Sequence, residues 1–235
     1  MRKKLHERIE VLHEDQDVIV VEKAAGVLSY PVDERDEDSA IRLIRRFWKI
    51  QNRKQEHVYL LHRLDKETSG LIAFAKTTLA RNSLSRQFEE HSVVRGYLAV
   101  THGIPAQERG TIQTFLGRDE RGKRAVRRKG RSATTLYRVV LVNRKLNRAL
   151  VRCYLHTGRT HQVRIHMAHL NTPVVGDVVY GVERSGRMAL HAEVLGFIHP
   201  RTGRPVLIRT SVPQELEHLL GSRSDRVYLQ SSALR

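Results

Sequence analysis

The sequence predicts an α+β fold, a mixed and largely antiparallel sheet flanked by helices. Apolar runs rich in β-branched residues recur along the chain, and several follow one another without a helical pattern between them. A doubly wound parallel sheet would instead alternate strands and helices. The chain has 235 residues with 40% hydrophobic content, and no repeat or linker-like tract divides it. We therefore expect one domain with a real core.

The first strand is expected over residues 17–23, DVIVVEK, which is apolar, rich in β-branched residues and followed by the turn AAG. Similar runs predict strands over residues 71–76, 96–103, 134–142 and 148–158. Strands are therefore expected to dominate the fold.

Helices are expected over residues 39–50, 77–91, 160–170 and 213–220. Helical spacing predicts buried faces through Ile41, Ile44, Phe47 and Trp48 in the first, and through Leu79, Leu84 and Phe88 in the second. Ser39 is a residue type favoured at helix N-caps, and Pro213 is tolerated in a first turn.

The balance of charge points to a polyanionic partner. Lys and Arg number 42 against 25 Asp and Glu, which gives a net charge of +17 and a pI near 10.6. Nucleic acid leads over an anionic membrane surface or acidic proteins. Residues 118–131 carry eight of these cations with only two acids, so they are expected to form a mobile loop that either contacts a nucleic-acid backbone or is simply solvated.

Other classes are disfavoured. The chain has neither an apolar run of membrane-spanning length nor a signal peptide, so a cytoplasmic protein is expected. Cys153 has no second cysteine for a disulfide or a zinc motif. GRDERGK, residues 117–123, fits a phosphate-loop pattern, but Arg124 follows where Ser or Thr would hold magnesium. Three histidines lie close together, at 161, 166 and 169. The spacing of His161 and His166 does not suit zinc, and that of His166 and His169 is allowable but lacks an obvious further ligand, so core or hydrogen-bonding roles are expected.

The stretch HRLDKETSGL, residues 62–71, supplies a candidate reactive carboxylate. Asp65 follows an apolar lead-in and precedes a Thr-Ser-Gly turn, which places it on a loop at a strand edge. A second turn, LHTGRTHQVRIH, carries Arg159 and Arg164. An arginine beside a carboxylate keeps it ionised and orients it, and such a carboxylate can act as nucleophile or base. Spacing alone leaves open whether the two segments meet.

Four ordered blocks resemble the RluA-type pseudouridine synthases. HRLDKETSGL resembles that family's HRLDxxTSGL signature, and RGYLAVTHG resembles the segment with its active-site tyrosine. TGRTHQVRIHMAHLNTPVVGDVVYG and MALHAEVLGFIHPRTG resemble its later blocks. The resemblance implies conversion of uridine to pseudouridine in ribosomal or transfer RNA on a mixed-sheet domain, without a metal or organic cofactor. It also implies base flipping, because the uracil must leave the stack to be cut, turned and rejoined.

The resemblance also implies roles for single residues. Asp65 would be the nucleophile or its mechanistic equivalent, Tyr97 would pack on the base and assist deprotonation at C5, and Arg164 would pair with Asp65. Arg63 would fill the space left by the flipped nucleotide. Further substrate-binding positions are expected at His62, Thr68, Arg159 and His161, of which His62 and Thr68 would shape the loop.

The chain departs from the family pattern at KAAG, where Ala24 replaces a usual proline and should loosen the turn. We expect a catalytic domain over residues 1–221, a basic tail over 222–235, no N-terminal RNA-binding module of the S4 kind, and a monomer by default. Two alternatives stay open. One is an RNA chaperone or assembly factor that keeps the fold with little dependence on catalysis; the other is a nucleotide-dependent RNA enzyme that uses residues 117–123.

Overall fold

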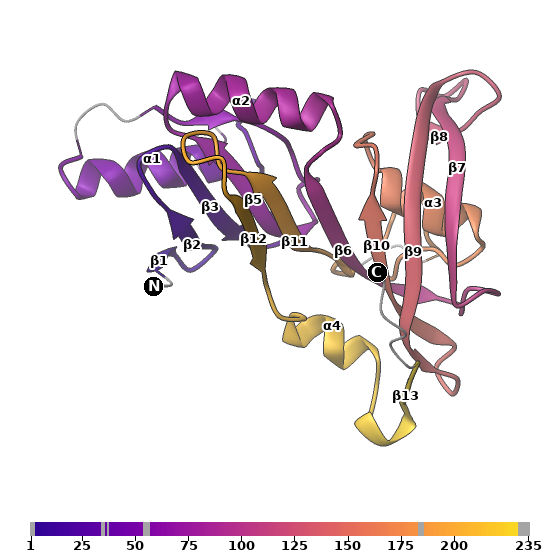
Figure 1. Ribbon diagram of the computed structural model, residues 1–235. Helices are drawn as coiled ribbons and strands as arrows, with labels where there is room; N and C mark the ends of the chain where they lie inside the picture. The colour runs from indigo at the N-terminus through magenta and orange to yellow at the C-terminus, as the bar shows by residue number, and fades with distance from the viewer. Residues whose placement is uncertain (1–2, 34–35, 37, 54–56, 183–185, 230–235) are drawn as a thin grey trace. The chain divides into compact units, whose positions relative to one another are not determined.

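The computed structural model describes residues 3–33, 36, 38–53, 57–182 and 186–229 (Figure 1). The chain forms two compact units, each built from two stretches of sequence. Unit 1 comprises Met1–Arg95 and Ala192–Ser211, and unit 2 comprises Gly96–His191 and Val212–Arg235.

Unit 1 contains a sheet with the strand order β1-β2-β3-β5-β11, to which β12 adds beside β11 and β4 beside β5. Its strands are β1 (Lys3–His6), β2 (Ile9–Glu14), β3 (Val18–Lys23), β4 (Tyr59–Leu60), β5 (Ser69–Ala75), β11 (Leu190–Ile198) and β12 (Pro205–Arg209). The β1–β2, β2–β3, β3–β5 and β11–β12 pairs run antiparallel. All seven residues of β5 are buried, so the strand expected at 71–76 is confirmed as a core strand of this unit.

Helices α1 (Ala40–Ile50) and α2 (Thr78–Glu89) complete unit 1 (Figure 1). Ser39 occupies the N-cap position of α1, as predicted, but its side chain makes no capping hydrogen bond. The buried side of α2 runs through Ala80, Leu84 and Phe88, which are four residues apart. Leu79 lies off that line and is 49% exposed, which corrects its predicted burial.

Unit 2 has the strand order β6-β10-β9-β7-β8, with β13 beside β9. Its elements are β6 (Val94–His102), which enters the unit at Gly96, β7 (Arg109–Arg118), β8 (Arg124–Val126), β9 (Arg131–Asn143), β10 (Arg148–Leu155), α3 (Gln162–His169), α4 (Gln214–Leu219), a 3-10 turn (Arg223–Asp225) and β13 (Val227–Tyr228). The predicted strands at 96–103, 134–142 and 148–158 correspond to β6, β9 and β10. Together the two units confirm the α+β class and its largely antiparallel pairing.

Two stretches expected to be irregular are partly regular. Within residues 118–131, β8 pairs with the end of β7, and Gly122 adopts φ +77° in the turn between them. Within the expected tail, β13 pairs with β9, so residues 227–228 belong to the sheet of unit 2. Parts of both basic stretches are therefore fixed by strand pairing in unit 2.

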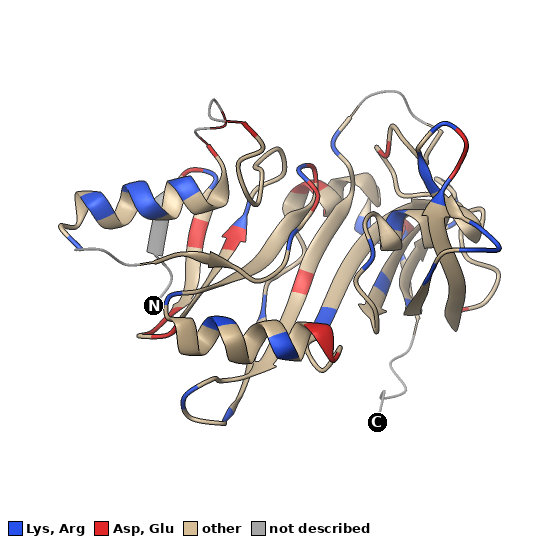
Figure 2. Ribbon diagram, turned by 90° about the horizontal axis from the view of Figure 1, so that it is seen from above, with Lys and Arg blue, Asp and Glu red and all other residues tan. Residues whose placement is uncertain are grey.

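Basic residues are unevenly spread over the helices of unit 1. Figure 2 shows basic bands along α1 without an acidic one, whereas α2 carries both signs. Within the described residues, none of the helices combines the length and hydropathy that a bilayer crossing needs.

Candidate active site

The loop that carries Asp65 joins β4 to β5 in unit 1 and is fixed on both sides. The Ser29 hydroxyl donates to the Leu64 carbonyl and accepts from the Leu64 N–H, each at 3.0 Å. On the other side the buried Thr68 donates its N–H to the Asp65 carbonyl at 3.1 Å. Asp65 is itself half-buried. This limited backbone freedom suits a group that must meet a substrate in one geometry.

The same loop is bonded to a buried lysine. Lys23, the last residue of β3, is fully buried, and its ammonium donates to the carbonyls of Thr68 at 2.5 Å and Lys66 at 3.1 Å. Burial lowers the Lys23 pKa to about 7, while the carboxylates of Glu67 and Asp65 act in the opposite direction. The buried amine of Lys23 therefore holds the backbone of the Asp65 loop through hydrogen bonds.

His62 and Arg63 precede Asp65 and differ in their surroundings. The His62 Nε2 accepts the N–H of Ala73 at 3.1 Å, and its ring stacks on Phe88 with 4.7 Å between centroids. Burial and the nearby Arg95 charge lower the His62 pKa to about 3, so the ring is neutral at physiological pH. Arg63 is exposed. His62 supports the loop from inside unit 1, and Arg63 is accessible to a ligand.

Arg164 lies on α3 in unit 2 and forms a buried ion pair with Asp177. Its Nε donates to Oδ2 at 2.7 Å and its Nη2 to Oδ1 at 2.8 Å. Burial raises the Asp177 pKa, but the hydrogen bonds and charge of Arg164 outweigh it and hold that pKa low. The guanidinium carbon is also 5.2 Å from the centre of the Tyr180 ring. One edge of Arg164 is therefore fixed, and its predicted pairing with Asp65 of unit 1 stays a prediction.

Tyr180, which lies beside Arg164, also contacts His161 and Lys123 in unit 2. Its hydroxyl is 3.0 Å from Nδ1 of His161, which precedes α3 in the left-handed conformation with φ 58°. Such a backbone is uncommon outside glycine and marks a constrained position. The Lys123 ammonium lies 4.9 Å from the Tyr180 ring centre. Arg159 is half-buried, and burial together with the Arg131 charge lowers its pKa.

Tyr97 lies on β6 in unit 2, half-buried and packed against the hydrophobic core of that unit. Its partner in the β10 register is Cys153, which is buried, and burial raises the pKa of that thiol to about 12. Cys153 is therefore an inert core residue. The predicted meeting of Tyr97 with Asp65 joins residues of different units and stays a prediction.

The clustered histidines include a structural one, as expected. His166 is fully buried, its Nδ1 is 2.8 Å from the Thr135 hydroxyl, and its Nε2 is 2.9 Å from the Thr114 hydroxyl. Burial lowers its pKa to about 4. Both ring nitrogens are used inside unit 2, so His166 is poorly suited to bind a metal.

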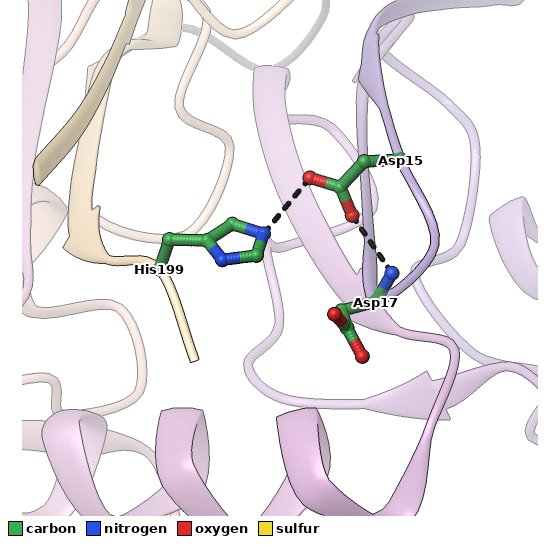
Figure 3. A group of neighbouring side chains, drawn as sticks. All are labelled: Asp15, Asp17 and His199. Atoms are coloured by element: carbon green, nitrogen blue, oxygen red, sulfur yellow. Dashed lines mark hydrogen bonds and ion pairs between the residues drawn. The ribbon is translucent and has the colours of Figure 1, made fainter. Parts of the chain in front are cut away.

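Among the residues that the structure describes, Asp15, Asp17 and His199 of unit 1 form a group that could bring metal ligands together, with ligand atoms within 4.8 Å of one another (Figure 3). These atoms are already engaged. Asp15 accepts from its own turn and lies 3.0 Å from His199 Nε2, while both Asp17 oxygens accept from Arg201 at 2.6 and 2.8 Å. The group closes the β2–β3 turn onto the β11–β12 hairpin, which makes it a structural cluster.

Sequence reasoning missed Lys23, Asp177 and Tyr180. Alternation along β3 places Lys23 on the same face as Ile19 and Val21, which was a usable signal for burial. Asp177 and Tyr180 stand inside the quoted GDVVYG block, but no pattern within it indicates that they surround Arg164.

Comparisons with known proteins agree with these motifs. Residues 17–169 match the family described as RNA pseudouridylate synthase. The chain is 36% identical over 219 residues to the uncharacterized RNA pseudouridine synthase YlyB of Bacillus subtilis, across 90% of this chain and 72% of that protein. It is 37% identical over 232 residues to ribosomal large subunit pseudouridine synthase D of Xanthomonas campestris, across 91% and 69%.

A solved structure, that of human RNA pseudouridylate synthase domain containing 1, has a TM-score of 0.78 to this chain at 26% identity, over 97% of this chain and 92% of the human one. The matched family segment includes Asp65, Tyr97 and Arg164. The chain therefore belongs to the RNA pseudouridylate synthase family and is an RNA pseudouridine synthase, an isomerase of the RluA type.

Proposed function

We propose that this enzyme isomerises a uridine of structured ribosomal RNA, with Asp65 acting on a flipped-out nucleotide. The observation that carries the role of Asp65 is its loop, which Ser29, Lys23 and Thr68 hold at the backbone while the carboxylate residue stays half-buried. Relatives named as ribosomal large subunit pseudouridine synthases favour ribosomal over transfer RNA.

The reaction is an isomerisation with no net oxidation. The bond from C1′ of the sugar to N1 of uracil breaks, a bond from C1′ to C5 forms, C5 loses its proton and N1 gains one. In the proposed roles Asp65 is the nucleophile, Tyr97 packs on the base and assists the loss of the C5 proton, and Arg164 keeps Asp65 ionised. Tyr97 offers both an aromatic face and a hydroxyl, and Arg164 is oriented by Asp177.

Asp65→Asn tests the proposal, and Glu67→Gln is its matched control because Glu67 is an exposed carboxylate of the same loop. Each variant would be returned to cells that lack the protein, and pseudouridines would be mapped separately in ribosomal and transfer RNA. We expect Asp65→Asn to lose one or more ribosomal pseudouridines that wild type and Glu67→Gln restore. Restoration by Asp65→Asn would refute the nucleophile, and loss confined to transfer RNA would refute the ribosomal target.

A further inference from the structure

Helix α1 carries a stripe of four basic residues, which we call the α1 stripe: Arg42, Arg45, Arg46 and Lys49. Their spacing of three and four residues puts them on one side of the helix over about 10 Å of its length. Arg45, Arg46 and Lys49 are exposed and Arg42 is half-buried. The helix contains no acidic residue, as the basic bands in Figure 2 show.

The apolar side of α1 is already buried within unit 1, through Ala40, Ile41, Leu43, Ile44 and Trp48. A helix that lies in a membrane interface must offer its apolar face to the lipid. The buried face of α1 cannot do so, although Ile50 is exposed at its end. A binding partner of α1 would therefore contact the basic side of the helix.

The end of α1 is firmly held. The cations of Arg53 and Lys76 lie 4.7 Å and 5.4 Å from the Trp48 ring centre, and both donate to Glu14 Oε1, at 2.5 Å and 3.0 Å. These contacts join the helix end to β2 and to the residue after β5. The α1 stripe thus stands on an ordered support and would lose little freedom on binding.

Like charges three and four positions apart destabilise an isolated helix. Arg45 and Lys49 of the α1 stripe form such a pair, whereas on α2 Arg86 lies near Glu90 in the opposite-charge arrangement. A phosphate backbone placed along α1 would offset the repulsion between Arg45 and Lys49. Nucleic acid carries roughly one charge per 1.7 Å in duplex form, so a stripe of about 10 Å can face several phosphates.

We propose that the α1 stripe is an RNA-binding surface of unit 1 that contacts the phosphate backbone. This inference rests on the proposed function, because it assumes that RNA is the substrate. The contact is independent of sequence and contributes affinity, so it should change KM and leave kcat nearly constant.

The test compares Arg45→Gln/Lys49→Gln on α1 with Arg81→Gln/Arg86→Gln on α2. Each pair removes two exposed cations from a helix of unit 1, and glutamine preserves helix propensity. The probe is a labelled RNA hairpin with an extended stem, titrated at several salt concentrations. Circular dichroism verifies that both variants are folded.

For the α1 variant we expect binding weaker by about 10- to 30-fold and a salt slope smaller by about 2. The α2 variant should bind like wild type. Equal losses in the two variants would overturn the proposal, as would unchanged RNA binding with weaker binding to phosphatidylserine vesicles. If RNA binding is weaker in the α1 variant but not in the α2 variant, and the wild-type protein forms no pseudouridine, the RNA-binding role of the α1 stripe is supported and the proposed function is refuted.

Discussion

Lys23→Met tests whether a buried ammonium holds the Asp65 loop. Methionine keeps the unbranched length of lysine but removes the donor to the carbonyls of Thr68 and Lys66. The Lys66 carbonyl keeps the N–H of Gly26 at 2.8 Å, so mainly the Thr68 carbonyl is left without its donor. An unsatisfied buried carbonyl costs about 1–3 kcal/mol.

The charge of Lys23 has a larger effect on stability, and in the opposite direction. Its pKa falls from 10.5 to about 7 through burial. At about 1.36 kcal/mol per pH unit, the charged form costs the folded state about 5 kcal/mol. Because the folded pKa is the lower one, the unfolded chain binds more protons between about pH 7 and 10.5, and the wild-type free energy of unfolding rises with pH in that window. Lys23→Met should lose this rise and should be no less stable than wild type at pH 7.

Lys23→Met should lower the activity even though it does not lower the stability at pH 7. A loop displaced by about 1 Å can cost 100-fold in rate, so we expect kcat of Lys23→Met to fall by about 10- to 100-fold. Chemical unfolding across pH gives the stability, and single-turnover pseudouridine formation gives the rate. Lys76→Met is the matched control, because this side chain is 8% exposed and bonds Glu14 and the Asp15 carbonyl, away from the Asp65 loop. A variant with wild-type kcat, or with the wild-type rise in stability above pH 7, would refute the reasoning.

Two further outcomes are expected. Asp177→Asn should destabilise the protein by about 3–5 kcal/mol in chemical unfolding, because it removes the negative charge that holds the Nε and Nη2 of the buried Arg164. The low pKa of Asp177 means that its contribution to stability is lost as the pH falls through that pKa, so equal acid sensitivity of variant and wild type would contradict this. Arg63→Ala should slow modification of a stacked RNA stem more than modification of a loose strand. Lys66→Ala, which also removes an exposed cation of the loop, should affect the two RNAs equally. Equal losses on the two RNAs for Arg63→Ala would rule out insertion of Arg63 into the stack.

The strands that sequence reasoning found are those with dense β-branched runs, such as β3 and β9. It missed β7 because only Ile112 and Leu116 are buried there, four residues apart, which weakens the alternation. It missed β11 as a strand because buried His191 and Glu193 interrupt its apolar pattern. The Asp15 cluster also escaped notice, since it depends on a contact between residues 184 positions apart.

Asp65, Tyr97 and Arg164 were identified as candidates because each stands in a motif, and their catalytic roles stay predictions. The bonds among those residues were not predictable. Asp177 is 13 positions from Arg164 and Lys23 is 45 from Thr68, and only tertiary folding selects such partners. Motifs therefore identify candidate residues for the chemistry, whereas their supporting contacts need the structure.

Each unit is assembled from two separated stretches, and this bears on how the chain folds during synthesis. The core strand β5 is flanked in its sheet by β3 and by β11, and most of β11 comes from the second stretch of unit 1. Until the ribosome has made that stretch, the edge of β5 opposite β3 is paired only at Phe74 and Ala75, with β4, and the rest of this apolar edge is open, which promotes aggregation. A nascent chain stalled before Ala192 should therefore engage chaperones.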